Sequence, residues 1–299
     1  MPALGGPPAC GVHARVRGAE AGATLLRVIE PVVPVSWLRE HRKVVVVADV
    51  RWYLDGRSGR AAYEGGHLPG AIFVELEEVL SGHADATSGR HPLPSPEVFA
   101  AALSRLGIHD DATVVAYDDE GGVIAARLAW MLRALGRDAA ILDGGIAAWD
   151  GPLDTEETVL PPADATAVPW PAELLASMDE LATADALIVD ARNGDRYRGE
   201  NEPVDPRAGH VPGAVSVPCR ENLDANGRLL PRDELRRRFE AAGVTADRPV
   251  ISYCGSGVTA THNLLTLEYA GLGRGRLYPG SWSQYSRAAD RPVETGDAR

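Results

Sequence analysis

One cysteine, Cys254, lies in a segment whose residues could support a chemical reaction, S-Y-C-G-S-G-V-T-A from Ser252 to Ala260. Cys254 ends an apolar run, and the two glycines that follow let the chain curl with positive φ. Several backbone N–H groups can then point at the sulfur, which favours a thiolate, a persulfide anion or an oxyanion. A free cysteine is commonly a buried small hydrophobe, but packing gives no reason for Gly255-Ser256-Gly257. We therefore interpret Cys254 as a nucleophile.

A cysteine in a strand-loop-helix turn also serves phosphatases, which need an arginine six residues later to bind phosphate in a bidentate way. That position is Ala260 here, so the phosphatase interpretation fails. Cys10 stands in a start of the chain that is rich in Gly, Ala and Pro, and Cys219 is expected to be structural. No metal or organic cofactor is expected, because no ligand cluster or phosphate-binding motif appears.

Composition places the chain among ordinary globular proteins. Its 299 residues are 45% hydrophobic and 24% charged, a make-up and length that favour two domains. A formal net charge of -12 argues against nucleic acid or an anionic membrane as a partner. The 3 cysteines form no CxxC pair, which favours a reducing compartment. Since no segment approaches the length of a membrane span, we expect a cytoplasmic protein.

The sequence repeats itself once. V-V-V-V-A-D-V-R at 44–51 matches A-L-I-V-D-A-R at 186–192, and H-L-P-G-A at 67–71 matches H-V-P-G-A at 210–214. Two more pairs follow in the same order, T-V-V-A-Y with P-V-I-S-Y and L-D-G-G-I-A-A-W with Y-P-G-S-W-S-Q-Y. Ordered matches of this kind predict two copies of one fold.

These matches place boundaries along the chain. Residues 151–170 carry prolines without an amphipathic period, which is typical of a linker. We predict a first domain over 28–150 and a second domain over 171–299. Residues 1–27 are expected to be a disordered extension.

Inside each copy, short apolar runs alternate with helical patterns. The runs at 44–47, 113–117, 139–142, 187–189 and 250–253 are typical of strands buried on both faces. Helical spacing occurs within 96–107, 123–136, 234–243 and 259–271. The alternation predicts an α/β fold in which each domain is a mostly parallel sheet flanked by helices on both faces. Ligands of such sheets lie at the carboxyl ends of strands, where Cys254 stands.

The repeated H-[LV]-P-G-A motif and the P-G-S-W-S-Q-Y ending resemble the signatures of the rhodanese family. The tandem arrangement covers nearly the whole chain after residue 27, and C-G-S-G-V-T is similar to the active loop of the 3-mercaptopyruvate sulfurtransferase branch. The family has two sheet domains of this kind, and only the C-terminal copy is catalytic. The position that matches Cys254 in the first copy is Asp118, in Y-D-D-E-G-G-V, and an aspartate cannot carry sulfur.

The resemblance implies a double displacement. Cys254 would take sulfur from 3-mercaptopyruvate, release pyruvate, and pass the sulfur from its persulfide to cyanide or to a thiol such as thioredoxin or a small thiol. Members that use thiosulfate typically place basic residues in this loop to meet a dianion. The loop from Gly255 to Thr259 contains none, which favours a keto acid whose carboxylate is bound elsewhere.

The resemblance also implies how the substrate is bound. Arg196 and Arg207 match the arginines that hold the substrate carboxylate and ketone, with Arg198 as the alternative if the register slips. Loop residues that would line the substrate are Gly255, Gly257, Val258 and Thr259.

A relay that polarises the substrate thiol is implied by the same resemblance. Its members would be Ser256, His91 and Glu77, of which His91 and Glu77 come from the first domain. The active site would then lie in a cleft between the domains. His67 and His210 recur in both copies although only one is catalytic, so we expect them to fix turns through side-chain hydrogen bonds.

Two other functions stay open on the sequence alone. The first is a thiosulfate sulfurtransferase on the same scaffold, transferring sulfur to cyanide. The second is a persulfide carrier or redox-sensing module, in which Cys254 receives sulfur from a partner protein and neither small donor turns over.

Overall fold

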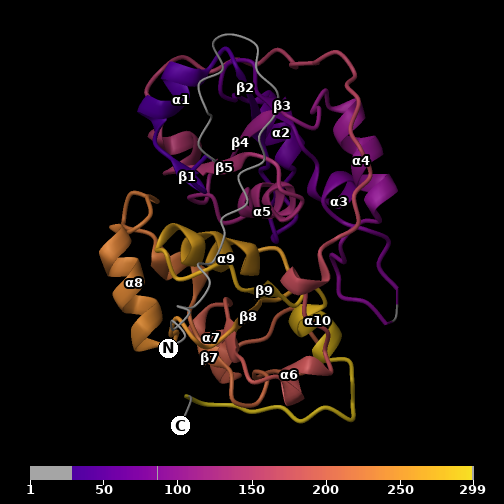
Figure 1. Ribbon diagram of the computed structural model, residues 1–299, viewed down its shortest axis with the longest axis vertical. Helices are drawn as coiled ribbons and strands as arrows, with labels where there is room; N and C mark the ends of the chain where they lie inside the picture. The colour runs from indigo at the N-terminus through magenta and orange to yellow at the C-terminus, as the bar shows by residue number, and fades with distance from the viewer. Residues whose placement is uncertain (1–28, 86, 298–299) are drawn as a thin grey trace, which may run out of the picture.

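The computed structural model describes residues 29–85 and 87–297, so the extension expected over 1–27 lies outside the described residues. Two α/β domains lie one above the other along the long axis of the molecule, the first indigo to magenta and the second orange to yellow (Figure 1). Each domain is built on its own parallel sheet. None of the helices in the described part of the chain is long and apolar enough to cross a membrane.

The first sheet has strand order β1-β5-β4-β2-β3, and all of its neighbours pair in parallel. Its strands are β1 (Val32–Val33), β2 (Val45–Asp49), β3 (Ile72–Phe73), β4 (Thr113–Tyr117) and β5 (Ala139–Leu142). The helices between them are α1 (Val35–His41), α2 (Gly59–Glu64), α3 (Leu76–Val79), α4 (Pro96–Arg105), α5 (Ala126–Ala134) and the 3-10 turn η1 (Gly145–Ala148).

The second sheet has order β7-β6-β8-β9 and is also parallel. Its strands are β6 (Leu187–Asp190), β7 (Val215–Ser216), β8 (Val250–Tyr253) and β9 (Arg276–Leu277). Around it lie α6 (Glu180–Thr183), α7 (Gly194–Arg198), α8 (Arg232–Ala241), α9 (Ala260–Tyr269), α10 (Ser281–Tyr285), and the 3-10 turns η2 (Ala172–Leu174) and η3 (Cys219–Asn222).

Strand residues alternate between two apolar layers, as the pleat of a strand requires. In β8, Val250 packs in the core that contains α8 and α9, whereas Ile251 and Tyr253 pack in the core that contains Tyr197 and Trp282. Both faces are therefore covered, which is why these strands read as continuous apolar runs.

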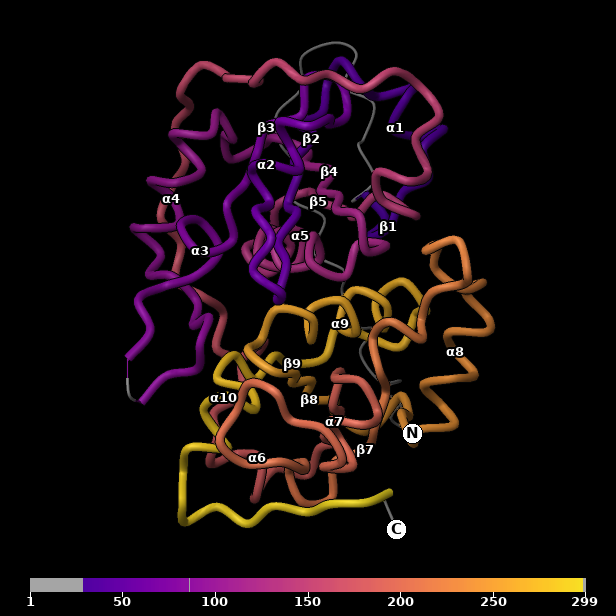
Figure 2. Tube along the Cα trace, turned by 180° about the vertical axis from the view of Figure 1, so that it is seen from behind, coloured from indigo at the N-terminus to yellow at the C-terminus, as the bar shows by residue number. Residues whose placement is uncertain are grey.

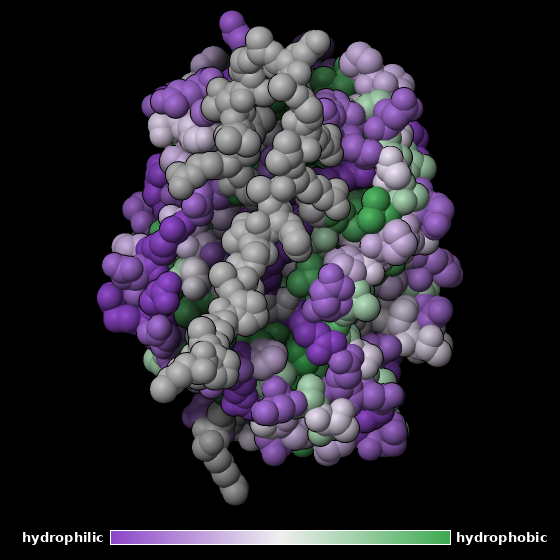
Figure 3. All heavy atoms as spheres, in the orientation of Figure 1, coloured by the Kyte–Doolittle hydropathy of each residue, from purple (hydrophilic) through white to green (hydrophobic). Residues whose placement is uncertain are grey.

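The domains meet through α5 and α9, which lie side by side between the two sheets in both views (Figures 1 and 2). Their side chains belong to a single buried core that continues from one domain into the other, with Leu128 and Leu264 both buried. This apolar contact fixes how the two domains sit against each other and therefore the shape of any site between them. On the face drawn in Figure 3, polar residues dominate the surface outside the grey atoms.

Residues 151–170 contain no helix and only the isolated bridge between Asp154 and His67. The segment runs along the first domain, where Trp170 Nε1 donates to the Pro94 carbonyl at 2.8 Å. The domain limits of 28–150 and 171–299 remain a prediction.

The recurring histidines are buried in both copies. His67 Nδ1 lies 2.8 Å from the Tyr63 carbonyl, and its ring stacks on Tyr63. His210 Nδ1 lies 2.7 Å from the Tyr197 carbonyl, and its ring stacks on Tyr197. Each therefore fixes the turn before the short strand that follows, and neither lies among the residues that line the cavity described below.

Candidate active site

Cys254 follows β8 directly and begins a loop that leads into α9. Its residue is 1% exposed, and the Gly257 N–H donates to its sulfur at 3.1 Å. Gly257 has a φ of +82°, and a Cβ there would meet the Pro279 carbonyl oxygen at 2.6 Å. Only glycine fits this position without strain, so the loop curls around the sulfur.

The P-G-S-W-S segment of the repeated motif holds the cysteine peptide in place. The Cys254 N–H donates to Ser281 Oγ at 3.1 Å, and the Cys254 carbonyl accepts from the Trp282 N–H at 2.9 Å. The next carbonyl, of Gly255, accepts from the Ser283 N–H at 2.8 Å. The motif therefore positions Cys254 by hydrogen bonds to its backbone.

A cavity of about 400 Å³ opens above Cys254. Its residues come from both domains, because Trp52, Leu54, Arg90, Glu120 and Ile124 line it from the first and the rest from the second. The lining residues of the second domain that the sequence predicted are Arg196, Cys254, Gly255, Ser256, Val258 and Thr259. The cavity therefore lies at the carboxyl end of β8, between the two domains.

Ser256, His91 and Glu77 form one hydrogen-bonded chain across the domain boundary. Ser256 Oγ lies 2.7 Å from His91 Nδ1, and His91 Nε2 lies 3.1 Å from Glu77 Oε1. Trp52 Nε1 also donates to Glu77 Oε1, at 3.2 Å, and its ring meets His91 edge-on. A carboxylate only accepts, so Nε2 carries the proton and Nδ1 is free to accept from the Ser256 hydroxyl.

His91 is buried, and burial lowers the pKa of its imidazole, with the positive charges of Arg127 and Arg90 adding to the effect. The Glu77 carboxylate opposes this shift. His91 is therefore neutral near pH 7 and able to take a proton passed on by Ser256.

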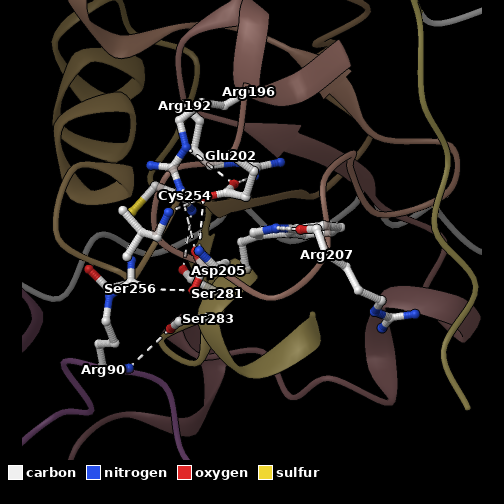
Figure 4. Close-up of polar contacts among 12 residues, drawn as sticks. Arg90, Arg192, Arg196, Glu202, Asp205, Arg207, Cys254, Ser256, Ser281 and Ser283 are labelled. Atoms are coloured by element: carbon white, nitrogen blue, oxygen red, sulfur yellow. Dashed lines mark hydrogen bonds and ion pairs between the residues drawn. The ribbon is translucent and has the colours of Figure 1, made fainter. Parts of the chain in front are cut away.

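Buried carboxylates lie behind the arginines that line the cavity. Glu202 lies between Arg192 and Arg196, with contacts of 3.2 and 2.5 Å, and Asp205 lies 3.3 Å from Arg196 and pairs with Arg90 (Figure 4). The ion pairs hold these arginines in place.

Two guanidinium groups, one from each domain, remain beside Gly255. A Cβ on Gly255 would lie 3.2 Å from Arg90 Nη2 and 3.5 Å from Arg196 Nη1. Within the described residues, neither nitrogen takes part in a hydrogen bond to Glu202 or Asp205. Both can bind a carboxylate in the space that the missing side chain leaves.

The prediction for Arg207 does not agree with its place in the structure. Arg207 is absent from the cavity lining, and Figure 4 shows its guanidinium directed away from Cys254. It donates to the carbonyls of four residues at 2.6–2.9 Å: Tyr285, Ser286, Ala288 and Arg291. Because these bonds occupy its guanidinium, we remove Arg207 from the substrate site. Its alternative, Arg198, pairs with Glu200 and does not line the cavity either.

Sequence reasoning missed Arg90, Arg192 and Trp52, all of which line the cavity. Arg90 directly precedes His91 in the sequence, so the expected place of His91 in the site could have indicated Arg90 as well. Arg192 recurs as Arg51 in the first copy, and each binds the aspartate two residues earlier, so its repetition indicates a structural role.

The fold and site together define a tandem α/β protein with a buried cysteine at the carboxyl end of a central strand and a cavity above it. The family model that matches is the rhodanese-like domain, over residues 35–151 and 171–288. The chain belongs to the rhodanese family and carries its domain twice.

Individual relatives agree with this assignment. The chain is 43% identical, over 85% of its length and 93% of the relative's, to a probable 3-mercaptopyruvate sulfurtransferase of Pseudomonas aeruginosa. It is 40% identical, over 85% of its length and 92% of the relative's, to a putative thiosulfate sulfurtransferase, SseB, of Mycobacterium tuberculosis. The crystal structure of the 3-mercaptopyruvate sulfotransferase SseA from Escherichia coli matches with a TM-score of 0.74 and 36% identity, over 85% of this chain and 100% of that one.

Proposed function

We propose that this protein is a sulfurtransferase that moves sulfur from 3-mercaptopyruvate, through a persulfide on Cys254, to a thiol or cyanide acceptor. The observation that carries the proposal is the contact of 2.7 Å between Ser256 Oγ and His91 Nδ1. Ser256 lies two residues after Cys254 in the sequence. The thiol of mercaptopyruvate has a proton to lose, whereas thiosulfate brings none at neutral pH. A base relay beside the sulfur therefore serves the first donor and not the second.

In the first half-reaction the Cys254 thiolate attacks the substrate sulfur and forms the S–S bond. The carbon–sulfur bond breaks, its electron pair goes to the enolate of pyruvate, and that enolate takes a proton. Ser256 passes the thiol proton of the donor to neutral His91, whose imidazolium Glu77 stabilises. Sulfur moves without an outside oxidant or reductant.

Arg196 and Arg90 bind the carboxylate and ketone of the donor in this proposal, with Arg90 in place of Arg207. The Gly257 N–H donates to the sulfur, and Gly255, Val258 and Thr259 line the cavity beside it, where the donor would bind.

In the second half-reaction an acceptor thiolate attacks the outer sulfur of the persulfide and releases the Cys254 thiolate. Thioredoxin or a small thiol is the acceptor that fits this chemistry, and cyanide would give thiocyanate. We also propose a cytoplasmic location, where the cell keeps thiols reduced, since both Cys219 and Cys254 are free thiols in the structure.

The name of the Mycobacterium tuberculosis relative supports thiosulfate as the second candidate donor. The experiment that decides compares kcat/KM for mercaptopyruvate and for thiosulfate, in the native protein and in Ser256→Ala. We expect the native protein to prefer mercaptopyruvate, and Ser256→Ala to lose about 100-fold with that donor and little with thiosulfate. A native preference for thiosulfate, or an equal loss with both donors, would refute the proposal.

A further inference from the structure

Arg127, in α5 of the non-catalytic domain, reaches across the domain boundary into the site. It is completely buried, and its Nη1 donates to the Gly257 carbonyl of the cysteine loop at 2.8 Å. Its Nη2 donates to the His91 carbonyl at 3.0 Å and to the Leu80 carbonyl at 3.2 Å. One guanidinium therefore holds both the loop that contains the nucleophile and the backbone that carries the relay histidine.

The bond to Gly257 also orients the next amide. In a trans peptide the carbonyl and the following N–H point in opposite directions, so fixing the Gly257 carbonyl turns the Val258 N–H away from Arg127. The N–H of Gly257 itself donates to Cys254 Sγ at 3.1 Å. Arg127 thus holds the carbonyl of the residue whose N–H contacts the sulfur.

The charge of Arg127 has no carboxylate beside it. Within the described residues, the hydrogen-bond acceptors of Arg127 are backbone carbonyls and it forms no ion pair. Burial lowers the pKa of Arg127 to about 10, and the electrostatic interaction that raises it is with Cys254. A buried cation remains at neutral pH, and a negatively charged sulfur is what compensates it.

Other charged and titratable groups also lie around the cysteine, and these residues are left unchanged in every variant of the test. They are Arg90, Glu120, Arg192, Asp195, Arg196 and Arg220 around the cavity, Glu202 and Asp205 paired with its arginines, His91 beside Ser256, and the buried thiol of Cys219.

We propose that Arg127 is a positioning residue for sulfur transfer, holding the cysteine loop against the relay histidine and supplying the buried positive charge that stabilises the anionic sulfur. The inference rests on the proposed role of Cys254 as nucleophile. It gives the inert domain a second contribution besides the relay, delivered from a helix whose other side chains pack the domain interface.

The test uses Arg127→Met, Arg127→Lys and a matched control, Arg133→Met. Arg133 is also a buried arginine of α5. It joins the two domains through Glu268 of α9, and it donates to the carbonyls of Ile29 and Ala139 in its own domain. Its removal therefore weakens the same interface at a different place. The first readout is the rate of Cys254 alkylation by iodoacetamide between pH 5 and 10, followed on the Cys254 peptide by mass spectrometry without any sulfur donor.

In Arg127→Met we expect alkylation at pH 7 to slow about tenfold, because the variant loses a buried cation and the bond that holds Gly257, whose N–H donates to the sulfur. Arg127→Lys keeps the charge but cannot hold all three carbonyls. It should keep a nearly native profile and lose about tenfold in kcat for mercaptopyruvate, with KM within about threefold of native. Arg133→Met should keep both the native profile and the native kcat.

If Arg127→Met does not fold, the proposal is tested by the kcat of Arg127→Lys for mercaptopyruvate. A native kcat in Arg127→Lys, a native alkylation profile in a folded Arg127→Met, or an equal loss in Arg133→Met would overturn the proposal. Failure of the proposed function is distinguishable, since it would appear as no sulfur transfer by the native protein while the alkylation comparison still held.

Discussion

Asp118 and Cys254 occupy the same place in the two domains, each directly after the central strand of its sheet, and the Asp118 carboxylate fills the cradle that surrounds the sulfur in the other copy. Asp118 Oδ1 accepts the N–H groups of Glu120 and Gly122, and Oδ2 accepts those of Ile124 and Ala125, all at 2.7–2.8 Å. The first loop thus carries its own anion and has no room for one from a substrate.

This arrangement predicts that Asp118 is a stability residue. Asp118→Asn places an NH₂ group against two of the four amides, so buried donors lose their acceptor. We expect the free energy of unfolding to fall by about 2–4 kcal/mol. Denaturant unfolding measures the loss, and kcat for mercaptopyruvate per folded molecule should remain within about twofold of native. A variant as stable as the native protein would show that the carboxylate does not hold the loop.

The relay predicts an acidic limb in the pH profile of kcat/KM for mercaptopyruvate. Burial lowers the pKa of His91, so the imidazole stays neutral and active to below about pH 6.5, the usual pKa of histidine. Glu77 raises that pKa, so Glu77→Gln should lower it further and move the acidic limb to lower pH.

The plateau of kcat/KM should also be lower in Glu77→Gln, because the neutral amide stabilises the imidazolium less. In His91→Asn we expect kcat/KM for mercaptopyruvate to fall about 100-fold. Trp52→Phe is the control, since it removes the other donor to Glu77 and leaves the carboxylate charge in place. An acidic limb that moves to higher pH in Glu77→Gln would be incompatible with the relay.

The arginines beside Gly255 predict a change in donor binding. Arg196→Lys and Arg90→Lys each keep the charge opposite Asp205 but lose the guanidinium fork that fits a carboxylate. KM for mercaptopyruvate should rise by about 10-fold to 100-fold. Steady-state kinetics with a fixed thiol acceptor measures it.

Arg207→Lys serves as the contrasting variant. It removes most of the bonds to the carbonyls that Arg207 holds, so it should lower the melting temperature and leave KM unchanged. A rise in KM for Arg207→Lys without one for Arg90→Lys would restore the sequence-based assignment and remove Arg90 from the site.

The longer strands of the fold could be predicted because both of their faces are buried. The runs expected at 113–117, 139–142 and 250–253 are β4, β5 and β8. The helical patterns contain α4, α5 and α9, and the pattern at 234–243 overlaps α8, which begins two residues earlier. β1, β3, β7 and β9 have two residues each and were not predicted. Such short strands exist because a neighbouring strand offers backbone partners, and two side chains carry no period that a sequence pattern could reveal.

For the site, the sequence predicted the parts that are local. Gly257 needs a positive φ, and Ser256 lies two residues from Cys254, so their place in the loop follows from the chain itself. The positions of Arg207 and Arg127 depend on carbonyls 36 to 130 residues away along the chain. Side-chain type and spacing do not say which distant carbonyl an arginine will meet, so the sequence did not reveal that Arg207 binds carbonyls outside the cavity or that Arg127 binds the cysteine loop.

The most direct test of sulfur transfer by Cys254 is mass spectrometry of the protein after incubation with 3-mercaptopyruvate and without an acceptor. We predict that the peptide containing Cys254 gains the mass of one sulfur atom, that an equal amount of pyruvate is released, and that Cys254→Ser shows neither. A native protein that gains no sulfur from mercaptopyruvate, or gains it equally in Cys254→Ser, would contradict this account.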